Sequence, residues 1–337
     1  MDKIVVQGGQ RLSGKVKVSG SKNAALPILA ATILGTGSFE LREIPELKDI
    51  ETMSRLLQGF GMKVSLGRHK AKIQTHTIKN HIAPYELVKT MRASVLVLGP
   101  LLARLGRAKV SLPGGCAIGA RPIDLHLKAL EAMGAEIKIE HGYVDATCAR
   151  LKGAQINFPF VTVTGTENIM MAAALAEGTT LIDNAAVEPE VVDLAQFLIQ
   201  MGAKIEGAGT RTLKIEGVPS LSGAKYQVMP DRIEAGTFMI GAAMNQGDVI
   251  VEGVIAEHIQ ALIEKMKEAG VQIGPAKNGL RVIGPKKIKA VDIETAPYPG
   301  FATDFQAQFM AMMTLAEGSS HINETIFENR YMHVGEL

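Results

Sequence analysis

The sequence has no tryptophan, two cysteines and few aromatic residues, which make up 4% of its 337 positions. So few aromatic side chains argue against a base-stacking platform or an aromatic carbohydrate cleft. Two cysteines are too few for a disulfide framework or a multi-cysteine metal site. The 36 Lys and Arg residues nearly balance 34 Asp and Glu residues, and the net charge of +2 excludes a strongly basic nucleic-acid binder.

Long apolar runs are also missing. The first nine residues contain no apolar segment of signal-peptide length. The longest apolar stretch, residues 93–105, is interrupted by Gly99, Pro100 and Arg104 and is too short to span a bilayer. We therefore expect a soluble cytoplasmic protein without nucleic-acid or membrane partners, with about two domains.

Glycine, by contrast, is abundant, with 35 residues. Helical segments rich in small residues are predicted over 24–34, 93–105, 166–177, 235–246 and 305–317. The glycines at their ends are Gly37, Gly106, Gly178, Gly247 and Gly318, spaced 69 to 72 residues apart. Glycine is typical just after a helix because it adopts positive φ without a Cβ penalty.

A second glycine series interleaves with the first. Amphipathic helices are predicted over 53–60, 125–133, 192–201 and 259–269. Each is followed by a glycine, namely Gly61, Gly134, Gly202 and Gly270, spaced 68 to 73 residues apart. Two series with one period predict a repeated α/β unit of roughly 70 residues. Four units are complete, and the fifth ends after its first helix and the strand at 319–323.

The segment at 112–122 holds three glycines, two prolines, Cys116 and Arg121, and it is therefore predicted to be a loop. A nearby arginine can lower the pKa of a thiol, and glycine-rich backbone N–H groups can bind an anion. The alternative interpretation is a surface loop with an incidental cysteine.

Charged residues gather at the expected starts of the first helix series. Lys22 and Asn23 stand at one start, where helix N–H groups and the lysine favour a phosphate or carboxylate. Arg92 stands at the corresponding position one repeat later, and Arg232 and Asp304 stand at similar positions in the fourth and fifth repeats. If rotation relates the repeats, these starts converge on a common cleft. The alternative for Lys22 is a solvated side chain after an asparagine cap.

Three segments carry a family resemblance: 21–27 (SKNAALP), 112–122 (LPGGCAIGARP) and 328–333 (ENRYMH). They resemble the UDP-N-acetylglucosamine 1-carboxyvinyltransferases, and the resemblance covers the whole chain. It implies an α/β, two-domain enolpyruvyl-transferase fold, with repeats arranged as an inside-out α/β barrel. Domain one would comprise 21–229, between a flexible stretch before Ser21 and a hinge near Pro230. Domain two would comprise 1–20 and 230–337.

The resemblance also implies the reaction. The enolpyruvyl group of phosphoenolpyruvate is transferred to the 3'-hydroxyl of UDP-N-acetylglucosamine by addition–elimination, and phosphate is released. This is the first committed step of peptidoglycan synthesis, which links the chain to cell-wall biogenesis, cell shape and division. No metal or organic cofactor is implied, and His126, His321 and His333 show no ligand spacing.

By resemblance, Cys116 is the proton donor, can form an adduct with phosphoenolpyruvate, and is the target of fosfomycin. Lys22, Arg92 and Arg121 surround phosphoenolpyruvate, and arginine suits its anionic groups through bidentate geometry. Asn23 accompanies Lys22.

Further resemblance makes Asp304 the candidate base for the attacking hydroxyl. The nucleotide contacts would be Arg121, Pro122, Ile123, Asp124 and Leu125. Ile326 matches a sugar-nucleotide contact. Phe160 stands where some members have a lysine, so no contact is assigned to it.

The resemblance leaves an alternative open. Family members have a sixth repeat, and six units predict about 420 residues. We therefore expect an incomplete second domain of low thermal stability, without two phosphoenolpyruvate ligands. A nucleotide-sugar-binding protein without turnover is the alternative function. The shikimate-pathway transferase is a third possibility, which the Cys116 loop argues against.

Overall fold

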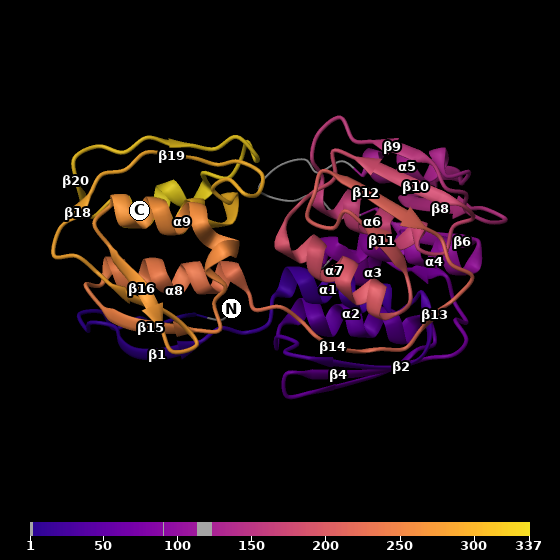
Figure 1. Ribbon diagram of the computed structural model, residues 1–337, viewed down its shortest axis with the longest axis horizontal. Helices are drawn as coiled ribbons and strands as arrows, with labels where there is room; N and C mark the ends of the chain where they lie inside the picture. Colours follow the sequence, from indigo (N-terminus) through magenta and orange to yellow (C-terminus); the bar gives the residue numbers. More distant parts are fainter. Residues whose placement is uncertain (1–2, 90, 113–122) are drawn as a thin grey trace. The chain divides into compact units, whose positions relative to one another are not determined.

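The computed structural model describes residues 3–89, 91–112 and 123–337. The chain divides into two compact units (Figure 1): unit 1 contains Met1–Val18 and Pro230–Leu337, and unit 2 contains Ser19–Met229.

Unit 2 contains three successive repeats. The first consists of α1 (Lys22–Ala31), β2 (Gly35–Arg42), α2 (Lys48–Gly59), β3 (Lys63–Gly67) and β4 (Lys70–Thr75). The second consists of β5 (Ile82–Ala83), α3 (Tyr85–Val88), η1 (Arg92–Val97), α4 (Leu98–Leu105), β6 (Arg107–Ser111), α5 (Asp124–Ala132), β7 (Glu136–Glu140) and β8 (Tyr143–Thr147). The third consists of β9 (Gln155–Asn157), α6 (Val163–Ala173), β10 (Thr179–Asp183), α7 (Pro189–Gln200), β11 (Lys204–Glu206) and β12 (Thr212–Glu216), and it leads into β13 (Leu221–Ser222) and β14 (Lys225–Gln227).

Unit 1 begins with β1 (Ser13–Lys17) and resumes after unit 2 with the fourth repeat. That repeat consists of α8 (Arg232–Met244), β15 (Asp248–Glu252), η2 (Ala256–Ile259), α9 (Gln260–Glu268), β16 (Gln272–Ala276) and β17 (Gly279–Ile283). The remaining elements are β18 (Ile288–Lys289), β19 (Ile293–Glu294), η3 (Thr303–Phe305), α10 (Gln306–Met313), β20 (Ala316–Glu317), β21 (Ile322–Asn323) and η4 (Met332–Glu336).

In the described part of the chain, four sheets share one plan. Each has a central antiparallel pair, β2/β4, β6/β8, β10/β12 or β15/β17. A hairpin adds an antiparallel edge strand, which is β3, β7, β11 or β16. The other edge is a short parallel strand from another part of the chain: β13 with β14, β5, β9 or β1. The repeated unit predicted from the glycine spacing is therefore a repeated sheet topology.

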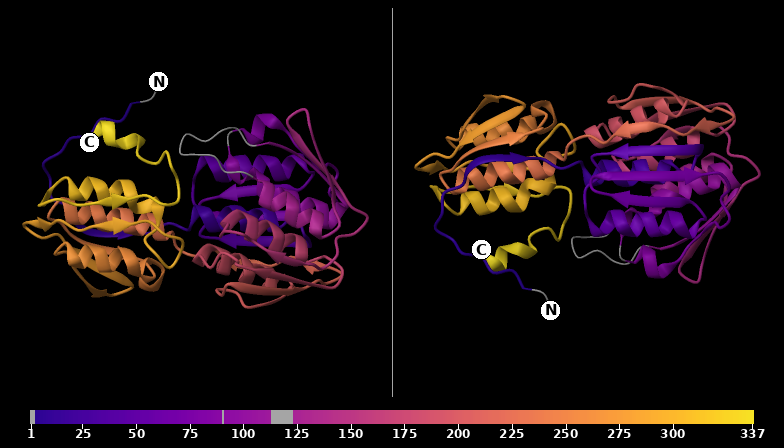
Figure 2. Two further views of the ribbon diagram at one scale, coloured as in Figure 1. Left: turned by 90° about the horizontal axis from the view of Figure 1, so that it is seen from above. Right: turned by 90° about the horizontal axis from the view of Figure 1, so that it is seen from below.

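Helices α1 and α6 lie inside unit 2 and its sheets lie outside (Figure 1 and Figure 2). Every residue of α1 from Ala24 to Ala31 is buried, and so is every residue of α6 from Gly165 to Ala173. Strand β4 instead alternates between exposed and buried residues, as expected when one face of a sheet meets water. None of the described sheets closes into a hydrogen-bonded barrel. The α/β fold of repeated units is thus confirmed.

The predicted helices of the first series need correction at both ends. The structure places α1 at Lys22–Ala31 rather than 24–34, and α6 at Val163–Ala173 rather than 166–177. Likewise, α8 spans Arg232–Met244 rather than 235–246, and α10 spans Gln306–Met313 rather than 305–317. Buried residues such as Ile33 and Leu34 continue beyond the helix end, so apolar character does not mark the boundary.

The helix predicted over 93–105 is two elements, η1 followed by α4. The side chain of Asn168 enters the backbone ladder here: its Oδ1 accepts from Gly99 N at 2.7 Å, and its Nδ2 donates to Val95 O at 3.1 Å. The amide thereby replaces the i→i−4 bond between these two backbone groups. Pro100 has no N–H for the next bond, which also favours a break in the helix.

The glycines of the second series all have positive φ, between 93° and 109°, which confirms their role at helix ends. In the first series, only Gly106 directly caps its helix: Gly37 lies inside β2, and Gly178, Gly247 and Gly318 lie three to five residues beyond their helix ends. Near Gly247, Gln246 takes the left-handed conformation instead, with φ 51°. A Cβ at Gly247 would lie 2.5 Å from Leu12 O, so close backbone approach is what requires glycine at this position.

Candidate active site

Helix α1 places Lys22 and Asn23 in its first turn. The Ser21 hydroxyl caps this turn by accepting a hydrogen bond from Ala24 N at 3.3 Å. Lys22 Nζ lies 3.5 Å from Asp49 Oδ2, and the lysine side chain remains 41% exposed. The same helix turn therefore combines the positive end of the helix dipole with a partly exposed lysine, a combination that favours an anion.

Arg92 is the first residue of η1, which packs against α1. Its Nη1 is buried and has no hydrogen-bond partner among the described residues. A buried guanidinium nitrogen without a partner is costly, and an anionic ligand would satisfy it.

Helix α5 begins at Asp124, with Ile123 as its N-cap residue and Leu125 buried. The Asp124 carboxylate lies 4.0 Å from Lys128 Nζ through Oδ2, while its Oδ1 is buried without a partner in the described part of the chain. Cys116, Arg121 and Pro122 lie outside the described residues.

His126 links the start of α5 to the start of α6. Asn168 Nδ2 lies 3.0 Å from His126 Nδ1, and Thr164 Oγ1 lies 3.4 Å from His126 Nε2. Burial lowers the pKa of His126 to about 4, against a smaller opposing effect of Asp124, so the imidazole is neutral at pH 7. The histidine therefore holds two helix starts together.

In unit 1, Asp304 lies in η3, and Arg330 Nη2 donates to its Oδ1 at 2.5 Å. The arginine side chain is 19% exposed and the aspartate 38% exposed. Arg330 Nη1 is buried without a partner among the described residues. Ile326 is 36% exposed, and its N–H donates to Glu324 Oε1 at 2.9 Å. The structure thus brings Asp304 and the segment of Ile326 together.

Sequence reasoning missed two of these groups. Arg330 belongs to the ENRYMH run, yet no pairing with Asp304 was predicted for it. Glu324 follows a two-residue strand and belongs to no motif, so no sequence signal identifies it.

A third missed group is Glu167, a buried carboxyl in unit 2. Burial raises its pKa well above the usual range, and the nearby carboxylates of Glu190 and Glu188 raise it further. Its Oε1 has no partner in the described structure.

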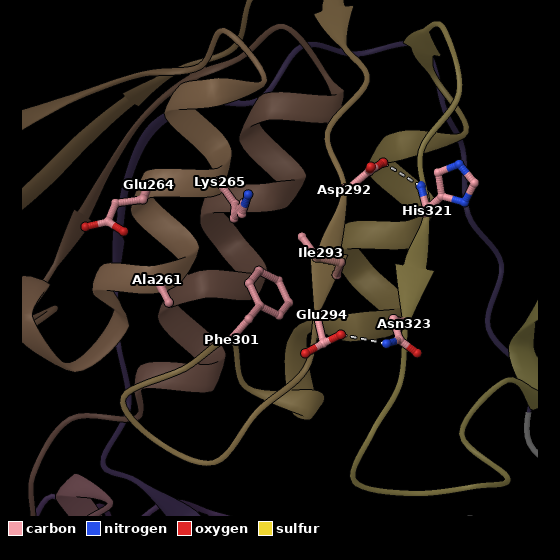
Figure 3. A pocket seen from close by; sticks show the side chains of 9 residues that line it. All are labelled: Ala261, Glu264, Lys265, Asp292, Ile293, Glu294, Phe301, His321 and Asn323. Carbon is pink, nitrogen blue, oxygen red and sulfur yellow. Dashed lines mark hydrogen bonds between the residues drawn. The ribbon is translucent and has the colours of Figure 1, made fainter.

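A cavity of about 520 Å³ lies in unit 1 between α9 and the strands β19 and β21 (Figure 3). Its polar groups largely serve the fold: Asp292 Oδ1 accepts from His321 N at 2.7 Å, and Glu294 Oε2 accepts from Asn323 Nδ2 at 2.7 Å. Neither Asp304 nor Ile326 lines it, so we do not assign the chemistry to this cavity.

Within residues 3–89, 91–112 and 123–337, no group of His, Cys, Asp and Glu side chains is arranged to hold a metal ion. No helix in these same ranges has the length and apolar character needed to cross a membrane.

Solved structures share the fold. The enolpyruvyl transferase NikO from Streptomyces tendae superposes with a TM-score of 0.87 at 22% identity, covering 98% of this chain and 79% of that one. An EPSP synthase from Acinetobacter baumannii gives a TM-score of 0.73 at 23% identity, covering 94% and 74%. The family model of EPSP synthase (3-phosphoshikimate 1-carboxyvinyltransferase) matches residues 6–337. The fold and the family match define an enzyme of the enolpyruvyl (carboxyvinyl) transferase class.

Curated relatives narrow this class. A protein of Geotalea uraniireducens (strain Rf4) named UDP-N-acetylglucosamine 1-carboxyvinyltransferase is 59% identical over 337 residues, covering all of this chain and 81% of that protein. Proteins of the same name from Geotalea daltonii and Thermodesulfovibrio yellowstonii are each 58% identical, with the same coverage. The chain belongs to the UDP-N-acetylglucosamine 1-carboxyvinyltransferase family.

Proposed function

We propose that this chain transfers the enolpyruvyl group of phosphoenolpyruvate to the 3'-hydroxyl of UDP-N-acetylglucosamine, releasing phosphate, as the first committed step of peptidoglycan synthesis. The observation that carries the proposal is the 57–59% identity, over essentially the whole chain, to relatives named for this activity. Both substrates are charged cytoplasmic metabolites, so we place the reaction in the cytoplasm.

Phosphoenolpyruvate carries a phosphate and a carboxylate, and both need cations. Lys22 at the first turn of α1 supplies a compact charge, and Arg92 supplies a guanidinium whose buried Nη1 bonds to no group among the described residues. Arg121 adds a third cation, and Asn23 supplies an amide beside Lys22. These positive groups would hold both anionic ends of the substrate.

The chemistry has two stages. In the addition, Cys116 gives a proton to the methylene carbon, the sugar 3'-oxygen bonds to the central carbon, and Asp304 takes the hydroxyl proton. In the elimination, the Cys116 thiolate takes a proton from the new methyl group, the double bond reforms, the C–O bond to phosphate breaks, and the departing phosphate takes the proton from Asp304. The segment Arg121, Pro122, Ile123, Asp124 and Leu125 would contact the nucleotide, and Ile326 would contact the sugar nucleotide.

The test is phosphate release by the purified chain with each substrate alone and with both. We expect release only with both substrates, and we expect Cys116→Ala to abolish it. Cys148→Ala is the matched control, because this thiol donates to Gly134 O at 3.3 Å and belongs to the fold. Release without the sugar nucleotide, or undiminished release in Cys116→Ala, would contradict the proposal.

Fosfomycin gives a second readout. We expect Cys116→Asp to keep turnover and to lose fosfomycin sensitivity, since a carboxylic acid can donate a proton but reacts poorly with the epoxide. Calorimetry with UDP-N-acetylglucosamine separates the alternative, in which the chain binds the nucleotide without turnover; the names of the relatives do not favour that alternative.

A further inference from the structure

The carboxylate of Glu324 accepts four hydrogen bonds from three separate segments of unit 1. Its Oε1 accepts from the Thr295 hydroxyl at 3.0 Å, from Ile326 N at 2.9 Å and from Phe327 N at 3.1 Å. Its Oε2 accepts from the Thr303 hydroxyl at 2.8 Å. An ionised carboxylate offers about four lone-pair sites, so these bonds use its accepting capacity fully.

These bonds reach both sides of the Asp304 site. Thr303 directly precedes Asp304 in η3. Ile326 and Phe327 begin the segment that leads to Arg330, whose guanidinium donates back to Asp304. Glu324 therefore closes a ring of contacts that fixes Asp304 from its own backbone and from its ion-pair partner.

The segment around Ile326 has no helix or strand ladder to hold it. Side chains hold it instead. Thr325 N donates to the Thr295 hydroxyl at 2.9 Å, and the Thr325 hydroxyl donates to Thr295 O at 2.5 Å. Glu324 N in turn donates to Tyr331 Oη at 2.9 Å. The position of the Ile326 backbone thus depends on polar contacts centred on Glu324.

We propose that Glu324 is a positioning residue for the transferase reaction, which sets the place of Asp304 and of the Ile326 segment relative to the sugar nucleotide. The inference rests on the proposed function for the roles of Asp304 and Ile326. Losing Glu324 affects binding of the nucleotide through Ile326 and the rate of hydroxyl attack through Asp304.

The test compares Glu324→Ala, Glu324→Gln and the control Glu336→Ala, in which an exposed carboxylate of the same unit is removed. For Glu324→Ala we expect a KM for UDP-N-acetylglucosamine raised about tenfold, a kcat lowered about tenfold, and a KM for phosphoenolpyruvate within about twofold of wild type. Glu324→Gln keeps one carbonyl oxygen for three donors, and the Thr303 hydroxyl can accept from its amide. We therefore expect this variant to stay within about threefold of wild type.

A merely structural role gives a different result. Partial unfolding lowers the active fraction and hence the apparent kcat, but it leaves both KM values unchanged. Unchanged KM for the sugar nucleotide in Glu324→Ala, with an active wild type, overturns this inference. An inactive wild-type chain contradicts the proposed function instead. Amide exchange at Ile326 and Phe327 adds a readout independent of turnover: we expect it to quicken in Glu324→Ala and not in Glu336→Ala.

Discussion

Arg330 donates a hydrogen bond from Nη2 to Oδ1 of Asp304 across 2.5 Å. The guanidinium is the more buried partner, and it lies over the Phe327 ring, with 5.5 Å between the guanidinium carbon and the ring centroid. Packing therefore fixes the arginine, and the arginine orients the carboxylate proposed to accept the hydroxyl proton.

Replacing Arg330 with lysine should impair turnover more than folding. A lysine keeps the positive charge but lacks the planar fork and the stacking face. We expect kcat to fall about tenfold or more, because one charge-assisted hydrogen bond in the site is lost. Steady-state kinetics and a thermal melt measure the two effects.

Arg281→Lys is the matched control for this change. Arg281 forms an exposed two-bond pair with Asp248 in the same unit, at 2.8 and 2.5 Å. Its replacement should leave kcat unchanged. Equal kinetic effects of the two substitutions would exclude a special role for the pair of Arg330 with Asp304.

The pH dependence of unit 2 should show the buried His126. Its folded pKa of about 4 lies below the ordinary 6.5, so the unfolded state binds more protons between these values. The stability that His126 contributes is therefore present above pH 6.5 and lost as the pH falls towards 4. The full loss is on the order of 3 kcal/mol. Urea unfolding of wild type and His126→Gln at several pH values measures the difference between them.

Asp193 changes the pH dependence of stability in the opposite direction to His126. Comparing wild type with His126→Gln is therefore needed to isolate the effect of the histidine. Burial raises the pKa of Asp193 to about 6, against the hydrogen bonds from Tyr226 and Met229 N. Its contribution therefore improves as the pH falls from 6 to 3.8. Direct NMR titration separates the two groups, and an imidazole midpoint near 6.5 for His126 would refute the prediction.

Alanine substitution at two glycines near helix ends should distinguish the stability cost of backbone strain from that of steric contact. Gly134 has φ 94°, and no atom lies within 4 Å of the place that a Cβ would take, so Gly134→Ala should cost about 1 kcal/mol. Gly106 has φ 71°, and a Cβ there would lie 2.5 Å from Cys148 O. Gly106→Ala should cost more than about 2 kcal/mol, because the neighbouring strand must move. Urea midpoints of the two variants give the comparison, and equal losses would contradict it.

The sequence predicted the C-terminal ends of the second-series helices α2, α5, α7 and α9 within one residue. Two of the predicted starts were wrong, because α2 begins at Lys48 rather than at 53 and α7 begins at Pro189 rather than at 192. These helices have one polar and one apolar face, and glycine follows each. The ends of the first-series helices were harder to predict. Helices such as α1 and α6 are buried on all sides, so their sequences show no periodic change between polar and apolar residues.

Some residues of the candidate site could likewise be predicted from the sequence, and others could not. Lys22, Arg92 and Asp304 stand in the first turn of their elements, where the repeat phase predicted them. Contacts formed only in three dimensions could not be predicted. The entry of Asn168 between Val95 and Gly99 joins residues about one repeat apart, and Glu324 gathers donors from segments that no local pattern connects.

Strands β13 and β14 pair with β2 in parallel, so the end of the third repeat completes the sheet of the first. During synthesis, the edge of β2 therefore stays uncovered until almost all of unit 2 has left the ribosome. β1 stays unpaired for longer still, because its partner β15 belongs to the fourth repeat. Such distant pairings slow folding and leave strand edges open to aggregation in the interval. We therefore expect the nascent chain to depend on chaperones until β14 and then β15 have emerged.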